Sequence, residues 1–265
     1  MTELAASGVL ALDGMALEYR WIAPPRPGAP TLVFLHEGLG CVALWKDFPD
    51  RVATATGCGA FVYSRAGYGR SSPVSLPRPL HYMHDEALAV LPQVLAAVKL
   101  GPVILVGHSD GASIALIHAG GGVARDVLGV AVLAPHVMNE EICVASIRQA
   151  KQAYEAGDLR PRLARLHGDN VDCAFWGWNG AWLDPDFMAW NITKYLPDIT
   201  VPLLVIQGHD DEYGSAVQYH AIATGCPGSV DVVVLNDCRH SPHRDQPEAT
   251  LDCLVRFIAE LKGRP

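Results

Sequence analysis

Residues 106–113 read VGHSDGAS and contain the pattern Gly-x-Ser-x-Gly, with Ser109 at its centre. The bare pattern is common, but here a β-branched run precedes it and an apolar run follows, which predicts a strand turning sharply into a helix. Gly107 and Gly111 suit such a turn because a Cβ at either position would strike the neighbouring backbone. The free N–H groups at the start of the helix favour negative charge beside the turn. The sequence therefore predicts that Ser109 is a nucleophile whose attack produces an oxyanion.

A serine nucleophile requires a base, and the base requires a group that fixes its tautomer. Asp210 and Asp211 come just after the apolar run PLLVIQG, and His240 and His243 come just after the next apolar run, VDVVVLN. The three residue types of such a site therefore follow one another along the chain in the order Ser, Asp, His. From position alone, either aspartate can be the acid and either histidine the base.

Short apolar runs alternate with helical segments along most of the chain, which predicts a doubly wound, mostly parallel α/β sheet. A hairpin is expected near the start, over 9–22. Helices are expected at 80–98, with a kink at Pro92, and at 246–262, capped by Asp245 and Glu248. The expected buried strands are 31–36, 60–64, 102–108, 128–135, 202–208 and 230–236.

The alternation breaks once, between His136 and about Asp198, where no strand is evident. Helices are expected at 139–157 and 159–167. About sixty residues is too long for a simple connection. We therefore predict a helical cap, 137–198, over the carboxyl edge of the sheet, inserted into a core of 1–136 and 199–265.

Four of the six tryptophans lie in the predicted cap. They either attach the cap to the sheet or line the substrate pocket, and with four so close we expect both. The tryptophans are Trp176, Trp178, Trp182 and Trp190, and the first three are the predicted pocket residues.

Five segments together resemble the α/β hydrolases over nearly the whole chain: LHEGLG, YSRAGYGRS, VGHSDG, IQGHDDEYG and RHSPHRDQPE. The resemblance implies an acid three residues after Gly208, which selects Asp211 over Asp210. It implies a base ahead of the final helix, which selects His240 over His243. Arg239 stands where the family usually has a glycine.

The resemblance also implies an oxyanion hole built from two backbone N–H groups. One is that of Asp110, and the other is that of Gly38, with Leu39 as the alternative. Glu37 replaces the first glycine of the family's loop. His36 and His108 are expected to form structural hydrogen bonds rather than to transfer protons.

Three further charged residues lie in or beside these segments: Arg65, Arg70 and Asp110. Arg65 and Arg70, in SRAGYGRSS, lie in a motif that is structural in the family. The Asp110 carboxylate is expected to face solvent or cap its loop. Alternatively, it points into the cleft and favours substrates with a cationic amino group.

Composition excludes several partners. The formal net charge is −8, without a Lys/Arg cluster, so nucleic acids and anionic membrane surfaces are poor partners. No apolar run is long enough to cross a bilayer, and no secretory signal is visible at the start. Seven scattered cysteines without a Cys-x-x-Cys pair indicate free thiols in a reducing compartment, hence a cytoplasmic protein. No metal or cofactor is expected, and a homodimer is possible.

Three functions are compatible with these residues. The leading hypothesis is a serine hydrolase of small carboxylic esters or thioesters, acting through an acyl-enzyme on Ser109. The second is a C–C bond hydrolase or lactonase for aromatic ring-cleavage products, in which arginines of the predicted cap would bind an anionic dienoate. The third is a non-catalytic ligand binder on a hydrolase scaffold. The cap arginines in question are Arg148, Arg160, Arg162 and Arg165.

Overall fold

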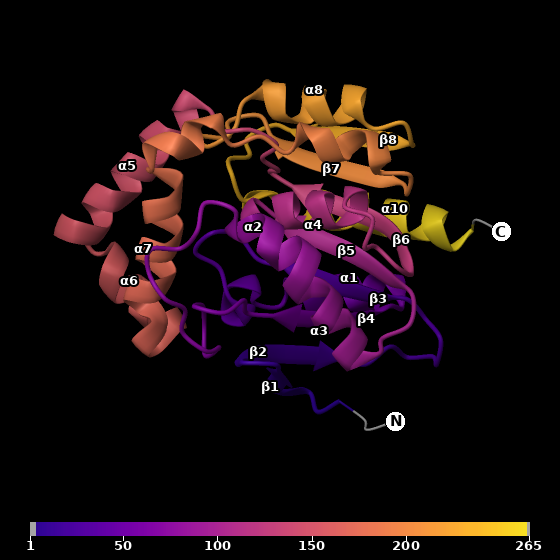
Figure 1. The fold of residues 1–265 in the computed structure, drawn as a ribbon. Coiled ribbons are helices and arrows are strands. Elements are labelled where there is room, and N and C mark those ends of the chain that lie inside the picture. Colours follow the sequence, from indigo (N-terminus) through magenta and orange to yellow (C-terminus); the bar gives the residue numbers. More distant parts are fainter. Residues whose placement is uncertain (1–3, 264–265) are drawn as a thin grey trace.

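The computed structural model describes residues 4–263, which form an eight-stranded sheet with helices on both faces (Figure 1). The strand order is β1-β2-β4-β3-β5-β6-β7-β8. The β1–β2 and β2–β4 pairs are antiparallel and all the other neighbours are parallel, which confirms the predicted sheet. The strands are Ser7–Leu12 (β1), Met15–Ile22 (β2), Thr31–Leu35 (β3), Gly59–Tyr63 (β4), Val103–His108 (β5), Val127–Leu133 (β6), Leu203–Gly208 (β7) and Val230–Leu235 (β8).

Strands β3, β4, β5 and β7 are buried along their whole length, and mostly apolar, because both faces of the sheet are covered. In β3, Leu32 and Phe34 face a core that includes α1 and α10, whereas Val33 and Leu35 face a core that includes α3 and α4. The helices are Phe48–Thr56 (α1), Tyr82–Asp85 (α2), Leu91–Val98 (α3), Asp110–Gly120 (α4), Glu141–Ala156 (α5), Leu159–His167 (α6), Val171–Trp182 (α7), Ala216–Gly225 (α8), Pro242–Asp245 (α9) and Pro247–Lys262 (α10). Shorter turns are Val42–Trp45 (η1), the π-helical Glu86–Val90 (η2), Gly168–Asn170 (η3), Pro185–Ala189 (η4) and Thr193–Asp198 (η5).

Two details of the helices differ from the sequence-based expectations. The segment expected as one helix kinked at Pro92 is helical without a break from Tyr82 to Val98, but its irregularity is the π-helical turn η2, which ends just before Pro92 in the first turn of α3. The cap predicted for α10 is wrong, because its N-cap is Gln246, without a side-chain cap bond. Asp245 instead accepts a hydrogen bond from the backbone N–H of Arg239, and Glu248 forms an ion pair with Arg51.

Helices α5, α6 and α7 form a separate group to the left of the sheet in Figure 1, in the stretch for which a cap was predicted. An isolated bridge between Met138 and Asn191 joins the two ends of this stretch. His167 and Asn170 connect it to the core, since they bond to backbone groups of the loops that follow β3 and β4. No helix between residues 4 and 263 combines the length and the apolar character needed to span a bilayer.

Candidate active site

Ser109 occupies the sharp turn between β5 and α4. Its φ and ψ are 52° and −116°, a conformation that non-glycine residues rarely adopt and that a tightly packed turn must enforce. A Cβ on Gly107 would lie 2.4 Å from the carbonyl oxygen of Gly111. A Cβ on Gly111 would lie 2.0 Å from the carbonyl oxygen of Leu35. Both glycines are therefore required for α4 to begin directly against the sheet.

The three residues predicted as nucleophile, base and acid lie in one hydrogen-bonded chain. Ser109 Oγ lies 2.9 Å from Nε2 of His240, and Nδ1 of His240 lies 2.9 and 3.0 Å from the two carboxylate oxygens of Asp211. Asp211 follows β7 and His240 follows β8, so the carboxyl ends of two neighbouring parallel strands bring them together. In this geometry the serine hydroxyl can donate to Nε2 while Nδ1–H donates to the carboxylate.

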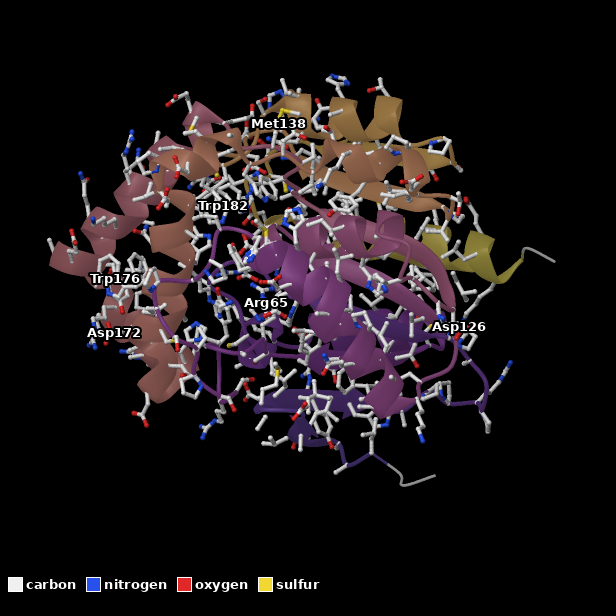
Figure 2. All side chains as sticks on the ribbon, viewed as in Figure 1. Arg65, Asp126, Met138, Asp172, Trp176 and Trp182 are labelled. Atoms are coloured by element: carbon white, nitrogen blue, oxygen red, sulfur yellow. The ribbon has the colours of Figure 1, made fainter. Side chains whose placement is uncertain are left out.

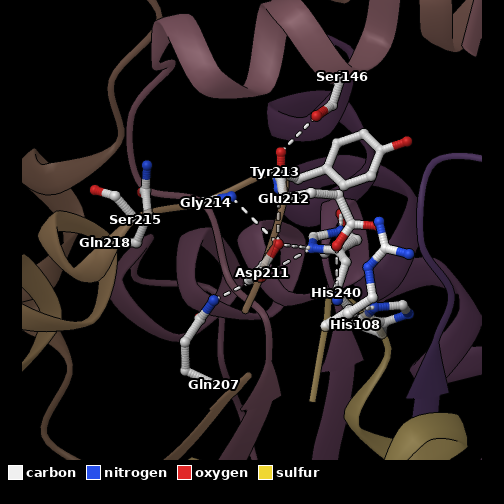
Figure 3. Close-up of polar contacts among 12 residues, drawn as sticks. His108, Ser146, Gln207, Asp211, Glu212, Tyr213, Gly214, Ser215, Gln218 and His240 are labelled. Carbon is white, nitrogen blue, oxygen red and sulfur yellow. Dashed lines mark hydrogen bonds and ion pairs between the residues drawn. The ribbon is translucent and has the colours of Figure 1, made fainter. Parts of the chain in front are cut away.

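Asp211 is held in place by donors besides His240 (Figure 3). Its oxygens accept from the side-chain amide of Gln207 at 2.6 Å and from the backbone N–H groups of Tyr213 and Gly214 at 2.8 and 3.3 Å. Burial alone would raise the pKa of Asp211, but His240 and the N–H of Tyr213 outweigh it and lower the pKa to about 2. Burial lowers the pKa of His240, whereas Asp211 raises it, and the net shift is upward. The arrangement therefore favours an ionised acid that orients the imidazole.

The alternative acid and base lie elsewhere. His243 is buried against Trp45 and Phe48, with ring centroids 4.8 and 5.6 Å away, and burial lowers its pKa to about 3. Asp210 lies at the surface, paired with the side chain of His209. The two residues that join Ser109 are thus Asp211 and His240, as the family resemblance implied.

The loop of residues 36–40 is fixed by donors to its carbonyl groups. The backbone N–H of Arg65 donates to Nε2 of His36, whose Nδ1–H donates to the carbonyl of Glu37. The Arg65 guanidinium, fully buried, donates to the carbonyls of His36 and Glu37. Nε2–H of His167 donates to the carbonyl of Leu39 at 3.0 Å. His36 and Arg65 therefore have the structural contacts that the sequence indicated.

Gly38 and Asp110, the residues predicted to supply the oxyanion hole, line the same cavity as Ser109, and so does Leu39. A Cβ on Gly38 would lie 2.2 Å from the indole of Trp178, so no larger residue fits there. The residues expected to supply the oxyanion hole therefore border the space beside Ser109 in which an oxyanion would form.

The first expectation for the side chain of Asp110 is wrong. The carboxylate is fully buried and neither faces solvent nor caps its loop. It accepts hydrogen bonds from the hydroxyl of Tyr82 and the indole N–H of Trp182, and it lies 3.8 Å from the guanidinium of Arg65. Burial raises its pKa, which Arg65 opposes. The carboxylate therefore already has a cation and two hydrogen-bond donors, which disfavours the alternative of a contact with a cationic substrate.

The cavity around Ser109 has a volume of about 670 Å³ and is lined by residues of the core and of α5, α6 and α7. Trp178 and Trp182 line it, as predicted. Trp176 does not: it lies on the outer side of α7 (Figure 2) and packs against Phe175. Trp190 packs against Trp182 and Phe187 behind the cavity wall.

Several lining residues escaped the sequence-based reasoning, among them His136, which follows β6 at the same edge of the sheet. Its imidazole is buried, its Nδ1 has no hydrogen-bond partner, and burial lowers its pKa to about 3. Glu37 was noted only as a departure from the family loop. Its carboxylate lies 3.5 Å from Nδ1 of His108, whose Nε2–H donates to the carbonyl of His240. Among residues 4–263, no three His, Cys, Asp or Glu side chains gather as metal ligands.

The buried histidines predict a loss of stability in acid. The pKa values of His136 and His243 lie near 3, below the ordinary 6.5, so the unfolded chain binds protons more readily. The free energy of unfolding should therefore fall as the pH drops from about 6.5 toward about 3, by about 2 to 3 kcal/mol per histidine at about pH 4.5. Urea unfolding at neutral and acid pH measures the difference. His243→Gln should reduce the pH dependence, and equal stability at both pH values would contradict the assignment.

Comparison with known proteins gives one family and one fold. A family model described as alpha/beta hydrolase family matches residues 32–252. The chain is similar in structure to a carboxylesterase from Nitrososphaera gargenis (16% identity, TM-score 0.76, covering 96% of this chain and 99% of that one). It is also similar to the enol-lactonase from Burkholderia xenovorans LB400 (19%, 0.72, 95% and 100%) and to the proline iminopeptidase of Mycobacterium smegmatis (17%, 0.70, 96% and 98%). No curated protein matches the sequence.

Proposed function

Because the chain belongs to the alpha/beta hydrolase family, we propose that it is a serine hydrolase of small carboxylic esters or thioesters. The observation that carries the proposal is the hydrogen-bonded chain from Ser109 through His240 to Asp211, which opens into a cavity of about 670 Å³. Nucleophile, base and orienting acid are the parts that acyl transfer needs. All seven cysteines are free thiols, which fits a reducing compartment, and we propose a cytoplasmic location.

The proposed reaction proceeds in two halves. Nε2 of His240 takes the proton of Ser109 Oγ as that oxygen attacks the substrate carbonyl. The backbone N–H groups of Gly38 and Asp110 stabilise the negative charge of the tetrahedral intermediate. His240 then gives the proton to the departing alcohol or thiol, which leaves an acyl-enzyme. Water, activated by the same imidazole, attacks the acyl-enzyme and releases the acid.

A lactonase or C–C bond hydrolase remains the second candidate, because two of the cap arginines considered for it, Arg162 and Arg165, line the cavity. The other two do not contribute: Arg160 is paired with Asp172 and Arg148 is outside the lining. Ser109 at the apex of the turn argues against haloalkane and epoxide chemistry, which uses an aspartate there in this fold. The intact hydrogen-bonded chain argues against a non-catalytic binder.

Labelling with a fluorophosphonate probe tests the proposal. The probe should modify one serine per chain, and mass spectrometry should map it to Ser109. Because only neutral His240 accepts the proton, and its pKa is raised, the labelling rate should rise with pH through a midpoint above about 6.5. Heat-unfolded protein is the control and should not react. Absence of labelling in the folded protein would favour the binder, and labelling elsewhere would overturn the assignment of Ser109.

A further inference from the structure

Four cationic side chains line the cavity that contains Ser109, and all four are exposed. They come from three separate parts of the fold. Lys46 follows η1, Arg162 and Arg165 lie on α6, and Arg244 lies on α9. Because each of them is both part of the lining and exposed, these side chains lie where the cavity meets solvent, which we call its mouth.

The acidic residues of the same lining do not neutralise this mouth. Asp110 is already occupied by Arg65, and Glu212 is paired with Arg239 at 3.1 Å. The third acid, Glu37, lies 3.5 Å from Nδ1 of His108, and its side chain is mostly buried. The four exposed cations therefore outnumber the one carboxylate of the lining that no arginine pairs with.

The cations themselves are largely free to meet a ligand. Among the ion pairs formed within residues 4–263, none involves Lys46, Arg165 or Arg244. Arg162 has Asp158 at 3.7 Å, but both side chains are mostly exposed, and solvent weakens such a pair. In a chain with a net charge of −8, this concentration of unpaired positive charge is a local exception.

The inner wall of the cavity has the opposite character. Its buried residues are mostly apolar or aromatic: Cys143, Ile147, Leu163, Trp178 and Trp182. A substrate that enters must place an uncharged, apolar portion against these side chains. Any charged portion is most stable at the mouth, where water and the four cations are available.

We propose that the substrate carries an anionic group, a phosphate or a carboxylate, on the part that remains at the mouth, and that Lys46, Arg162, Arg165 and Arg244 select it. This inference rests on the proposed function of Ser109. The group belongs either to the leaving group, as in an acyl thioester of a phosphorylated thiol, or to the far end of the acyl chain, as in a half-ester of a dicarboxylic acid. In both cases the cations increase the encounter rate and strengthen binding without taking part in the chemistry.

Two matched substrate pairs distinguish the sources. The first pair is a butyryl thioester of coenzyme A and the same acyl group on N-acetylcysteamine, which lacks phosphate. The second pair is the p-nitrophenyl half-ester of adipic acid and its methyl p-nitrophenyl diester. The wild type should show a higher kcat/KM for the charged member of at least one pair, by about 10- to 100-fold. Preference in the first pair identifies a phosphorylated leaving group, and preference in the second identifies an acyl carboxylate.

Glutamine substitutions then test the residues. Each single variant, such as Arg165→Gln, should lower kcat/KM for the charged substrate by about threefold. The variant that carries all four substitutions, called the fourfold variant, should lower it by about 30- to 100-fold. Turnover of the neutral partner should hardly change. Arg148→Gln is the matched control, because it removes an exposed cation of α5 outside the cavity lining. Added salt should reproduce the loss in the wild type and have little effect on the fourfold variant.

The outcomes separate this inference from the function on which it rests. Equal kcat/KM for the charged and neutral members of both pairs would overturn the anionic substrate. So would a fourfold variant whose kcat/KM for the charged substrate is no lower than that of Arg148→Gln. In either case Ser109 keeps its proposed role. Turnover of none of the four substrates, together with no fluorophosphonate labelling, overturns both.

Discussion

Alanine at position 109 is expected to lower kcat/KM by about 10⁴- to 10⁶-fold, because the variant loses the atom proposed to form the acyl-enzyme. His240 and Asp211 remain hydrogen-bonded to each other, and the cavity wall is otherwise unchanged. KM should therefore change little, and the loss should fall on kcat. Initial rates with the p-nitrophenyl ester that the wild type cleaves fastest measure the effect.

A serine near the site but outside the hydrogen-bonded chain serves as the control for this substitution. Ser146, on α5, donates to the backbone carbonyl of Glu212 (Figure 3), whereas the hydrogen bond of Ser109 is to His240. Ser146→Ala should stay within about tenfold of the wild type, since it removes one hydrogen bond between α5 and the loop that follows β7. If Ser109→Ala retained a comparable fraction of activity, another group would have to be the nucleophile.

The positions of Ser109, Asp211 and His240 were predictable because they depend on local turns at the ends of buried strands. Once the apolar runs are recognised as neighbouring parallel strands, the residues that follow them must lie at one edge of the sheet. From position alone, Asp210 and Asp211 were both candidate acids, and His240 and His243 were both candidate bases. The family resemblance made the selection. The structure gives a physical reason for the acid: Asp211 is the one whose carboxylate accepts the N–H groups of the following turn.

Contacts between residues far apart in the sequence were not predictable in this way. The partners of Asp110 are Tyr82 and Trp182, which lie 28 and 72 positions away, and no local pattern indicates that they converge. Glu248 resembles a capping residue by its position, but Arg51, 197 positions away, forms an ion pair with it.

Trp176, which was predicted to line the cavity and does not, is a different case, because its spacing in the sequence did indicate where it lies. Trp178 and Trp182 are four residues apart and therefore share one face of α7. Trp176 is two residues from Trp178, which places it on the far side of the same helix. Helical spacing, rather than the density of tryptophans, would have separated the pocket residues from the residue outside the pocket.

Replacing Asp110 with asparagine is expected to lower the free energy of unfolding by about 3 to 5 kcal/mol. Arg65 is fully buried, and Asp110 is the carboxylate that forms an ion pair with it. The neutral amide leaves the buried guanidinium with only the more distant carboxylate of Glu86 to offset its charge. Urea unfolding at neutral pH measures the loss. Asp172→Asn is the matched control: its ion pair with Arg160 is half-exposed, so solvent screens it and the loss should be far smaller.

A double-mutant cycle shows whether the loss comes from the unpaired charge. Arg65→Met removes the guanidinium, and with it the donors to the carbonyls of His36 and Glu37, so this single variant should also lose stability. Once Arg65 is absent, Asp110→Asn no longer leaves a buried cation without its partner. The additional loss in the free energy of unfolding should therefore be smaller by at least about 2 kcal/mol. Strictly additive losses would mean that the two side chains act independently. The Arg65→Met variant should also label more slowly with the fluorophosphonate, since the carbonyls it holds belong to the loop that contains Gly38, the proposed oxyanion donor.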